Sequence, residues 1–128
     1  RAFAKTPRDF TKKLPRQMRR LARNSAILAK ALSGAVMIVE GIQFDEPKTK
    51  KMAGILKAVK AERGALLAVP AASPNLLKSV RNIPNVVLKL VSDVNAYDVL
   101  RLRSVIFTPD AFKALTASPA TTERSAKA

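Results

Sequence analysis

The sequence contains no cysteine and no histidine. The absence of cysteine excludes disulfides, thiolate nucleophiles and zinc or iron–sulfur sites with cysteine ligands. The absence of histidine removes the commonest general base and metal ligand. Ser25, on the first predicted helix, therefore has no histidine to activate it as a nucleophile. We expect a protein without catalytic residues, metal site or cofactor.

Glycine is also scarce, with four residues in a chain of 128. Their positions match neither the G-x-G-x-x-G fingerprint nor a P-loop, so no glycine-rich turn can bring the backbone against a pyrophosphate. No apolar run approaches the roughly 20 residues of a membrane-spanning helix. Asp98 and the other acids near predicted helix starts are better explained by favourable interaction with helix N-termini than by a catalytic pair. A small-molecule substrate is therefore not expected.

Acidic residues are few, and positive charge is in large excess. Lys and Arg number 24 against nine Asp and Glu, so the net charge is +15. The length suits one domain, and a hydrophobic fraction of 48% is ample for a core. A strongly basic protein with a core is typical of nucleic-acid binding, and an anionic membrane surface is the second choice.

The positive charge is concentrated at the start of the chain. Ten of the cations fall within residues 1–30, where Asp9 is the single acid. Residues 1–13 are interrupted by proline and predict a basic extended arm. A helix follows, with Pro15 in its first turn and Gly34 just past its end. Mostly apolar residues recur along it at spacings of three and four and predict one stripe that packs on the core: Leu14, Met18, Leu21, Ser25, Leu28 and Leu32.

Short apolar runs alternate with helix patterns through the rest of the domain, which we place at residues 14–115. The runs predicted as strands are AVMIVE (35–40), ALLAVP (65–70), VVLKLV (86–91) and SVIF (104–107). The helices between them are predicted to begin near Pro47, Ser73, either Asp93 or Asn95, and Thr108. Strands that alternate with helices predict a parallel sheet with right-handed crossovers.

The expected fold class is therefore α/β. It has a mostly parallel four-stranded sheet flanked by helices, and it is Rossmann-like without a nucleotide-binding loop. Residues 116–128 are rich in Ala, Ser, Thr and charge, and they predict a mobile C-terminal tail. The chain begins with Arg1 rather than Met, and a helix precedes its first strand, so we expect further sequence upstream.

The cations of the arm and first helix are the main candidates for binding RNA phosphates. Asp9 lies in the predicted extended arm, so the helix itself offers no carboxylate for i,i+4 pairs with its cations, and a partner must supply the negative charge. A solvated surface is the alternative, but such surfaces usually mix signs. Arginine also favours bidentate contact with phosphate. This group comprises Arg1, Lys5, Arg8, Lys12, Lys13, Arg16, Arg19, Arg20 and Arg23.

Two smaller groups are further candidates. Lys48, Lys50 and Lys51 are predicted in the first turn of a helix, where cations oppose the helix dipole and local helix stability does not explain them. Arg81 and Asn82 precede Pro84, and they form either a plain turn or another RNA contact. No zinc-finger spacing, RNP aromatics or GXXG clamp appears, so we expect recognition of the shape and backbone of a structured RNA.

Four strings, at residues 7–30, 44–59, 79–88 and 95–112, resemble the bacterial-type L4 family of large ribosomal subunit proteins in order and spacing. The most specific are EPKTK (46–50) and RNIPNV (81–86). The segment VSDVNAYD (91–98) departs from the family pattern, with Asp93 in place of Gly and Ala96 in place of Val.

The resemblance implies an α/β domain that binds large-subunit ribosomal RNA early in assembly, beside neighbouring ribosomal proteins and near the peptide exit tunnel. It implies the C-terminal portion of such a protein, with the arm as the return of an upstream loop that reaches the tunnel. It also implies a ribosomal location, either in the bacterial cytoplasm or in an organellar matrix or stroma.

Two other classes of function stay open at this point. One is an α/β enzyme or small-ligand domain whose basic arm serves only for targeting. The other is a peripheral membrane binder, which the resemblance and the expected burial of the apolar stripe do not favour.

Overall fold

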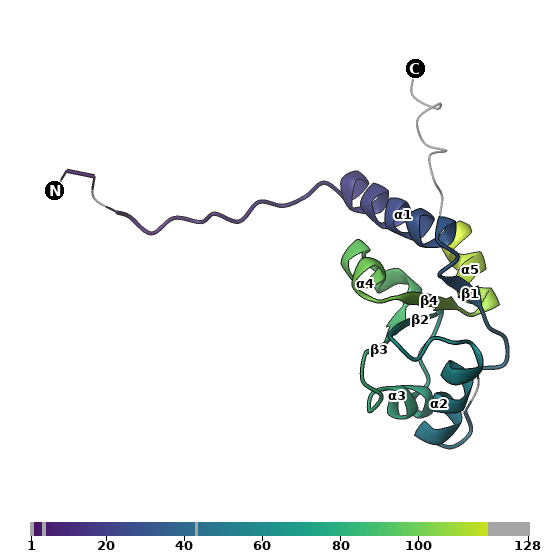
Figure 1. The fold of residues 1–128 in the computed structure, drawn as a ribbon. Helices are drawn as coiled ribbons and strands as arrows, with labels where there is room; N and C mark the ends of the chain where they lie inside the picture. Colours follow the sequence, from purple (N-terminus) through teal and green to yellow (C-terminus); the bar gives the residue numbers. More distant parts are fainter. Residues whose placement is uncertain (1, 4, 43, 118–128) are drawn as a thin grey trace.

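The computed structural model describes residues 2, 3, 5–42 and 44–117 (Figure 1). Within these residues the order of elements alternates helix and strand after a long first helix. The elements are α1 (Arg16–Leu32), β1 (Val36–Ile38), α2 (Thr49–Ala58), β2 (Ala65–Val69), α3 (Pro74–Val80), β3 (Val86–Leu90), the 3₁₀ helix η1 (Val91–Asp93), α4 (Ala96–Arg101), β4 (Ser104–Phe107) and α5 (Pro109–Thr116). Apart from Thr116 and Ala117, the predicted tail lies outside the described residues.

The strands form one four-stranded sheet in the order β1-β4-β2-β3, and every pair is parallel. The register places Leu66 of β2 opposite Val87 of β3 and Val105 of β4. All five residues of β2 are buried, because helices cover both faces of a parallel sheet. The expected α/β fold with a parallel four-stranded sheet is confirmed.

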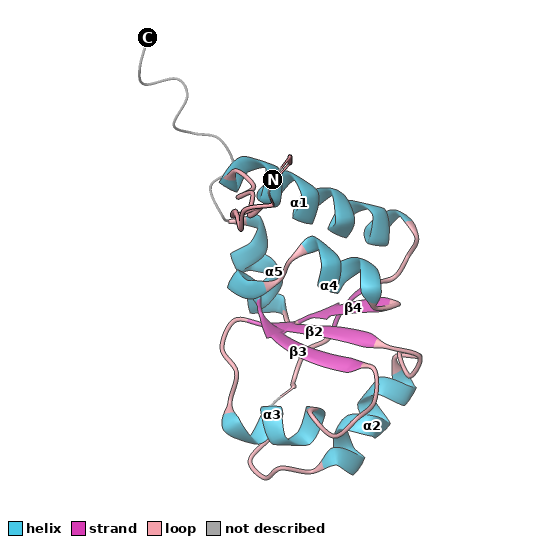
Figure 2. Ribbon diagram, turned by 90° about the vertical axis from the view of Figure 1, so that its left-hand side faces the viewer, coloured by secondary structure: helices cyan, strands magenta, loops and turns pink. Residues whose placement is uncertain are grey.

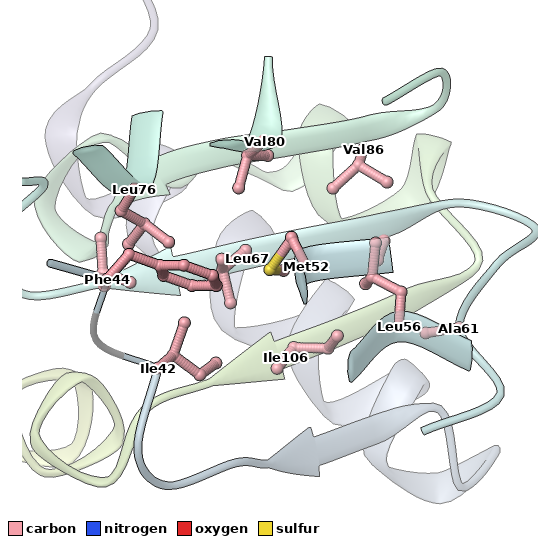
Figure 3. Close-up of a cluster of buried hydrophobic side chains, with 12 residues drawn as sticks. Ile42, Phe44, Met52, Leu56, Ala61, Leu67, Leu76, Val80, Val86 and Ile106 are labelled. Atoms are coloured by element: carbon pink, nitrogen blue, oxygen red, sulfur yellow. The ribbon is translucent and has the colours of Figure 1, made fainter. Parts of the chain in front are cut away.

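Helices cover the two faces of the sheet in separate groups. Figure 2 shows α2 and α3 on one face, α4 and α5 on the other, and α1 in an outer layer beyond α4 and α5. Successive side chains of a strand point to opposite faces. Leu67 therefore joins the core under α2 and α3, with Met52 and Ile106 (Figure 3). Leu66 joins the core under α4 and α5, with Val105 and Phe107.

Side chains cap three of the helices where the sequence predicts helix starts. The Ser73 hydroxyl accepts a hydrogen bond from the Leu76 N–H at 3.2 Å. The Asn95 side-chain oxygen Oδ1 accepts from the Asp98 N–H at 2.8 Å, so Asn95 and not Asp93 caps α4. The Thr108 hydroxyl accepts from the Ala111 N–H at 3.4 Å. Each bond satisfies a backbone donor that has no partner within its helix.

The prediction that the apolar stripe of α1 packs on the core is wrong. Met18, Leu21, Leu28 and Leu32 are 57%, 69%, 60% and 82% exposed, so the stripe faces outward. Ala26 is the residue of α1 that is buried, and Ile27 packs against the same core. The periodicity of a helix reveals an apolar face, but it does not reveal which face meets a neighbour. Here the small side chain of Ala26 allows α4 to approach. Pro15 also proves to be the N-cap, one residue before the helix.

Candidate nucleic-acid interface

The arm extends away from the sheet and its helices (Figure 1). Residues 5–14 contain neither helix nor strand and are exposed. They carry the predicted contacts Lys5, Arg8, Lys12 and Lys13, whereas Arg1 lies outside the described residues. Because the segment is exposed, the side chains of these cations are accessible from the solvent.

Two local contacts organise the arm. The guanidinium carbon of Arg8 lies 4.4 Å from the centre of the Phe10 ring, within the range of a cation–π interaction. The Asp9 carboxylate accepts a hydrogen bond from the Thr11 N–H at 2.8 Å. Hydrogen bonding to Thr11 holds the pKa of Asp9 below its usual value, so this carboxylate is ionised at neutral pH. It is bound to the backbone of the arm and not to a neighbouring cation.

Helix α1 continues the positive charge of the arm. Arg16, Arg19 and Arg20 are exposed, and Arg23 is half-buried with its Nε 3.5 Å from the Asn24 side-chain oxygen. The first turn of α1 contains no acidic residue, so its cations oppose the helix dipole. Local helix stability therefore does not account for them.

The charges of α1 and its apolar stripe lie on different sides of the helix. Arg16, Arg19 and Arg23 recur at spacings of three and four with Ala26 and Lys30, so these residues share one face. The C-terminal part of that face meets α4, and its N-terminal part presents arginines. Leu21 and Leu28 belong to the other side. The helix is therefore amphipathic, with its apolar side exposed.

The described residues contain two ion pairs, and neither involves the arm or α1. One joins the Lys48 ammonium to the Glu46 carboxylate at 2.7 Å, and the other joins Lys89 to Asp98 at 2.7 Å. Every described cation from Lys5 to Lys30 is therefore more than 4.0 Å from a described carboxylate oxygen. The predicted lack of internal charge partners is confirmed for this part of the chain.

The second predicted group surrounds the start of α2. Lys50 and Lys51 lie in the first turn, and Lys48 is the N-cap. The Lys51 ammonium lies 5.3 Å from the centre of the Phe44 ring. An open hollow of about 490 Å³ is lined by Pro47, Lys48, Thr49, Lys50 and Lys51.

Lys48 was predicted in the first turn of the helix, but it is the N-cap of α2, and its ammonium pairs with the Glu46 carboxylate. Both side chains are largely exposed, at 65% and 70%, and such a surface pair contributes about 0–1 kcal/mol to stability. The ion pair therefore holds the Lys48 side chain only weakly. The backbone N–H of Lys48 donates to the Ser79 hydroxyl at 3.0 Å, which holds the start of α2 against α3.

Arg81 and Asn82 lie at the end of α3, where both are exposed. Arg81 is the C-cap, and its N–H donates to the Leu77 carbonyl at 3.0 Å. The contact between Lys48 and Ser79 brings the Lys48 backbone within two residues of Arg81 along α3. Both smaller predicted groups therefore belong to the pair of helices α2 and α3. They lie on the α2 and α3 face of the sheet, whereas the arm and α1 belong to the opposite face (Figure 2).

One cluster of cations was missed by the sequence reasoning. Arg63, Arg101 and Arg103 line a second open hollow, of about 290 Å³, together with Lys30. Arg63 precedes β2, and Arg101 and Arg103 precede β4. Parallel strands all begin at the same edge of a sheet. The predicted alternation of strands and helices therefore already implied that residues directly before the strands lie at one edge.

Other kinds of site find no support in the described part of the chain. No described helix is both long and apolar enough to cross a membrane. Within the same residues there is no group of three or more acidic, histidine or cysteine side chains able to hold a metal ion. Asp98, expected at a helix N-terminus, lies in the first turn of α4, and its carboxylate pairs with Lys89.

Comparison with known proteins decides the family. The model of the Ribosomal protein L4/L1 family matches residues 1–118. The chain belongs to this family. The match includes the arm, α1 and all four strands, so the whole described interface lies within the family's sequence pattern.

Curated relatives agree with this assignment to the L4/L1 family. The large ribosomal subunit protein uL4 of Syntrophomonas wolfei is 38% identical over 110 residues, which cover 86% of this chain and 53% of that protein. The protein of the same name from Alkaliphilus oremlandii is 38% identical over 109 residues, covering 85% and 53%. That of Dehalococcoides mccartyi (strain 195) is 40% identical over 112 residues, covering 88% and 53%. The chain thus spans about half the length of the curated relatives it matches.

Proposed function

We propose that this chain is a structural constituent of the large ribosomal subunit. It binds large-subunit ribosomal RNA through the arm and the arginines of α1, and it stabilises the packing of that RNA during assembly, near the peptide exit tunnel. The observation that carries the proposal is the run of cations from Lys5 to Lys30 without an internal charge partner, in a member of the L4/L1 family. The proposal assigns no catalytic step, no cofactor and no small-molecule substrate.

The mechanism is neutralisation of phosphate charge on a rigid platform. Each phosphate that meets a Lys or Arg releases condensed counterions, which favours binding. The arm follows the RNA backbone, and the planar guanidinium groups of Arg16, Arg19, Arg20 and Arg23 contact phosphates in bidentate fashion. The parallel sheet and its two cores hold α1 in a fixed orientation, so the arginines are positioned before RNA arrives.

The cations near the start of α2 and the end of α3 give the protein RNA contacts on the side of the sheet opposite to α1. Lys48, Lys50, Lys51, Arg81 and Asn82 contact another RNA segment from the α2 and α3 face. RNA helices that repel one another are thereby held together across the domain. Neighbouring ribosomal proteins are further partners. Because the relatives named above are bacterial, we place the protein in a cytoplasmic ribosome, with the matrix or stroma of an organelle as the alternative location.

The test removes the charge of α1 and measures binding to ribosomal RNA fragments across a salt titration. The variant Arg16→Gln, Arg19→Gln, Arg20→Gln, Arg23→Gln loses four contacts, so the slope of log K against log salt becomes shallower by about three units. A matched control, Lys57→Gln, Lys60→Gln, Lys78→Gln, Lys113→Gln, loses the same charge elsewhere and retains most of the slope. Binding by the α1 variant that equals that of the control would sink the proposal.

One observation favours a second candidate function. The exposed apolar side of α1 lies beside a row of arginines, and such a helix is suited to the surface of an anionic membrane. Flotation with vesicles that contain anionic lipid separates the two candidates. Under the ribosomal proposal, RNA removes the protein from the vesicles, and Leu21→Gln leaves RNA affinity unchanged. Vesicle binding that persists in excess ribosomal RNA favours the membrane candidate.

A further inference from the structure

The hollow that contains Arg63, Arg101 and Arg103 lies where three strands of the sheet begin. Arg63 directly precedes Gly64 and β2, Asn85 precedes β3, and Arg103 precedes β4. Lys30, near the end of α1, and residues 100–102, at the end of α4, complete its lining. Three segments that are distant in the sequence therefore place cations around one space of about 290 Å³, and a fourth segment contributes the uncharged Asn85.

The backbone at this edge is adapted to close approach of the strands. Gly64 has a φ of +132°, which other residues rarely adopt. A Cβ at this position would also lie 3.4 Å from the carbonyl oxygen of Asn85. That carbonyl accepts a hydrogen bond from the Ala65 N–H at 3.1 Å, so the two strand starts are fixed to one another. This bond holds Arg63 and Asn85, which both line the hollow, on neighbouring strand starts.

Lys30 neutralises carbonyl oxygens beside the hollow that would disfavour an anion. Its ammonium donates to the carbonyl oxygens of Leu102 and Arg103 at 2.8 Å and 3.2 Å. These carbonyls follow the C-terminus of α4, whose partial negative charge would otherwise repel an anion. Because Lys30 is occupied in this way, the three guanidinium groups are the ones that remain for a ligand.

The three arginines have no charge partner among the described residues. Neither of the two ion pairs includes them, and the lining of the hollow contains no acidic side chain. Glu62 is adjacent in sequence to Arg63 but forms no ion pair with it. The C-terminus of α4 favours a cation and so explains Arg101 locally. It does not explain Arg63, which comes from the loop after α2.

We infer that this hollow binds a backbone phosphate of RNA, as a contact separate from the arm and from the Lys48 group. The inference rests on the proposed function, because it assumes that the chain binds RNA. Three guanidinium groups around one space suit a phosphate, which accepts several charge-assisted hydrogen bonds. Helix α1 has 17 residues and is roughly 25 Å long. The arm joins its first end and the hollow lies beside its last turn, so one RNA segment along α1 reaches both.

The first test compares two charge-matched variants for binding to large-subunit ribosomal RNA fragments across a salt titration. The hollow variant is Arg63→Gln, Arg101→Gln, Arg103→Gln, and the control is Lys57→Gln, Lys78→Gln, Lys113→Gln. All six side chains are exposed, so both variants should fold, and an unchanged urea midpoint verifies this. We expect the slope of log K against log salt to become shallower by about two units in the hollow variant and by less than one in the control.

The outcomes of this test distinguish the inference from the proposed function. If the unmodified chain binds ribosomal RNA selectively and the hollow variant behaves as the control does, the inference is wrong and the proposed function stands. If the unmodified chain does not prefer ribosomal RNA to random RNA, the proposed function fails and the inference falls with it.

A second test locates the RNA directly. The chain contains no cysteine, so one cysteine introduced as Glu62→Cys or as Lys113→Cys can be labelled at a single position. The label is an iron chelate that cleaves RNA close to it. Residue 62 is exposed and directly precedes Arg63, which lines the hollow, whereas residue 113 lies on α5, beyond the opposite end of β4. We expect discrete cleavage from position 62 that is lost when Arg101→Gln and Arg103→Gln are added. Equal cleavage with and without these changes, or none from position 62, would overturn the inference.

Discussion

The ion pair between Lys89 and Asp98 gives the sharpest prediction about stability. It links β3 to α4, with 2.7 Å between the ammonium and the carboxylate. The two side chains differ in exposure, because that of Lys89 is 32% exposed and that of Asp98 only 12%. Asp98 Oδ2 itself is buried, and among the described residues the Lys89 ammonium is its one polar partner. The cost to stability therefore depends on which of the two partners is removed.

Lys89→Met leaves a buried carboxylate without a partner, which costs about 1–3 kcal/mol. Asp98→Asn leaves an ammonium on a flexible stem that already reaches water, so its cost is smaller, about 0.5–1 kcal/mol. The double variant Lys89→Met, Asp98→Asn costs less than the sum of the two, since the carboxylate is then absent. The burial of Asp98 therefore predicts that Lys89→Met lowers the free energy of unfolding more than Asp98→Asn does.

Urea denaturation at 25 °C and neutral pH measures these differences. For a chain of this size, a loss of about 2 kcal/mol moves the midpoint by about 1 M. A control pair on the surface, Lys48→Met and Glu46→Gln, should each change the free energy of unfolding by less than about 1 kcal/mol. Costs for Lys89→Met and Asp98→Asn that are equal, or larger for Asp98→Asn, would refute the reasoning.

The remaining predictions concern the core and α1, and both are measured by urea denaturation. Leu67→Ala removes a fully buried side chain in the middle of β2, so the free energy of unfolding should fall by about 2–5 kcal/mol; a change below 1 kcal/mol would contradict the burial found here. Leu21→Gln, on the exposed side of α1, should cost less than about 0.5 kcal/mol, whereas Ile27→Gln, which packs on the core, should cost more than 1 kcal/mol. The reverse order would show that the stripe packs inward as the sequence predicted.

The main helices and strands of the domain could be predicted from the sequence. ALLAV is a short apolar run that is buried on both faces of a parallel sheet, as its composition predicts. Ser73 and Thr108 precede prolines and cap their helices, because their hydroxyls accept bonds from backbone donors three residues later. These features are local, so the physics that produces them can be read from neighbouring residues.

Features that depend on distant partners could not be predicted in the same way. The stripe through Leu21 and Leu28 has the period of a helix, yet the side that meets α4 is the one with Ala26. The pairing of Lys48 with Glu46 depends on the geometry of the turn before α2.

The arrangement of the candidate site shows the same limit. The arm and α1 were correctly predicted to lack internal charge partners, because acidic residues are almost absent near them in the sequence. Their place on the opposite side of the sheet from Lys48 and Arg81 depends on the order of the strands. The gathering of Arg63 with Arg103 requires the knowledge that β2 and β4 are neighbours.

The central claim is that the unpartnered cations of the arm and α1 bind a particular RNA. The most direct test measures the affinity of this chain for large-subunit ribosomal RNA fragments and for random RNA of equal length, across a salt titration. The account predicts tight binding to one set of ribosomal fragments, with a steep salt dependence and weaker binding to random RNA. Equal affinity for both at every salt concentration would contradict it, since the charge would then act on any polyanion.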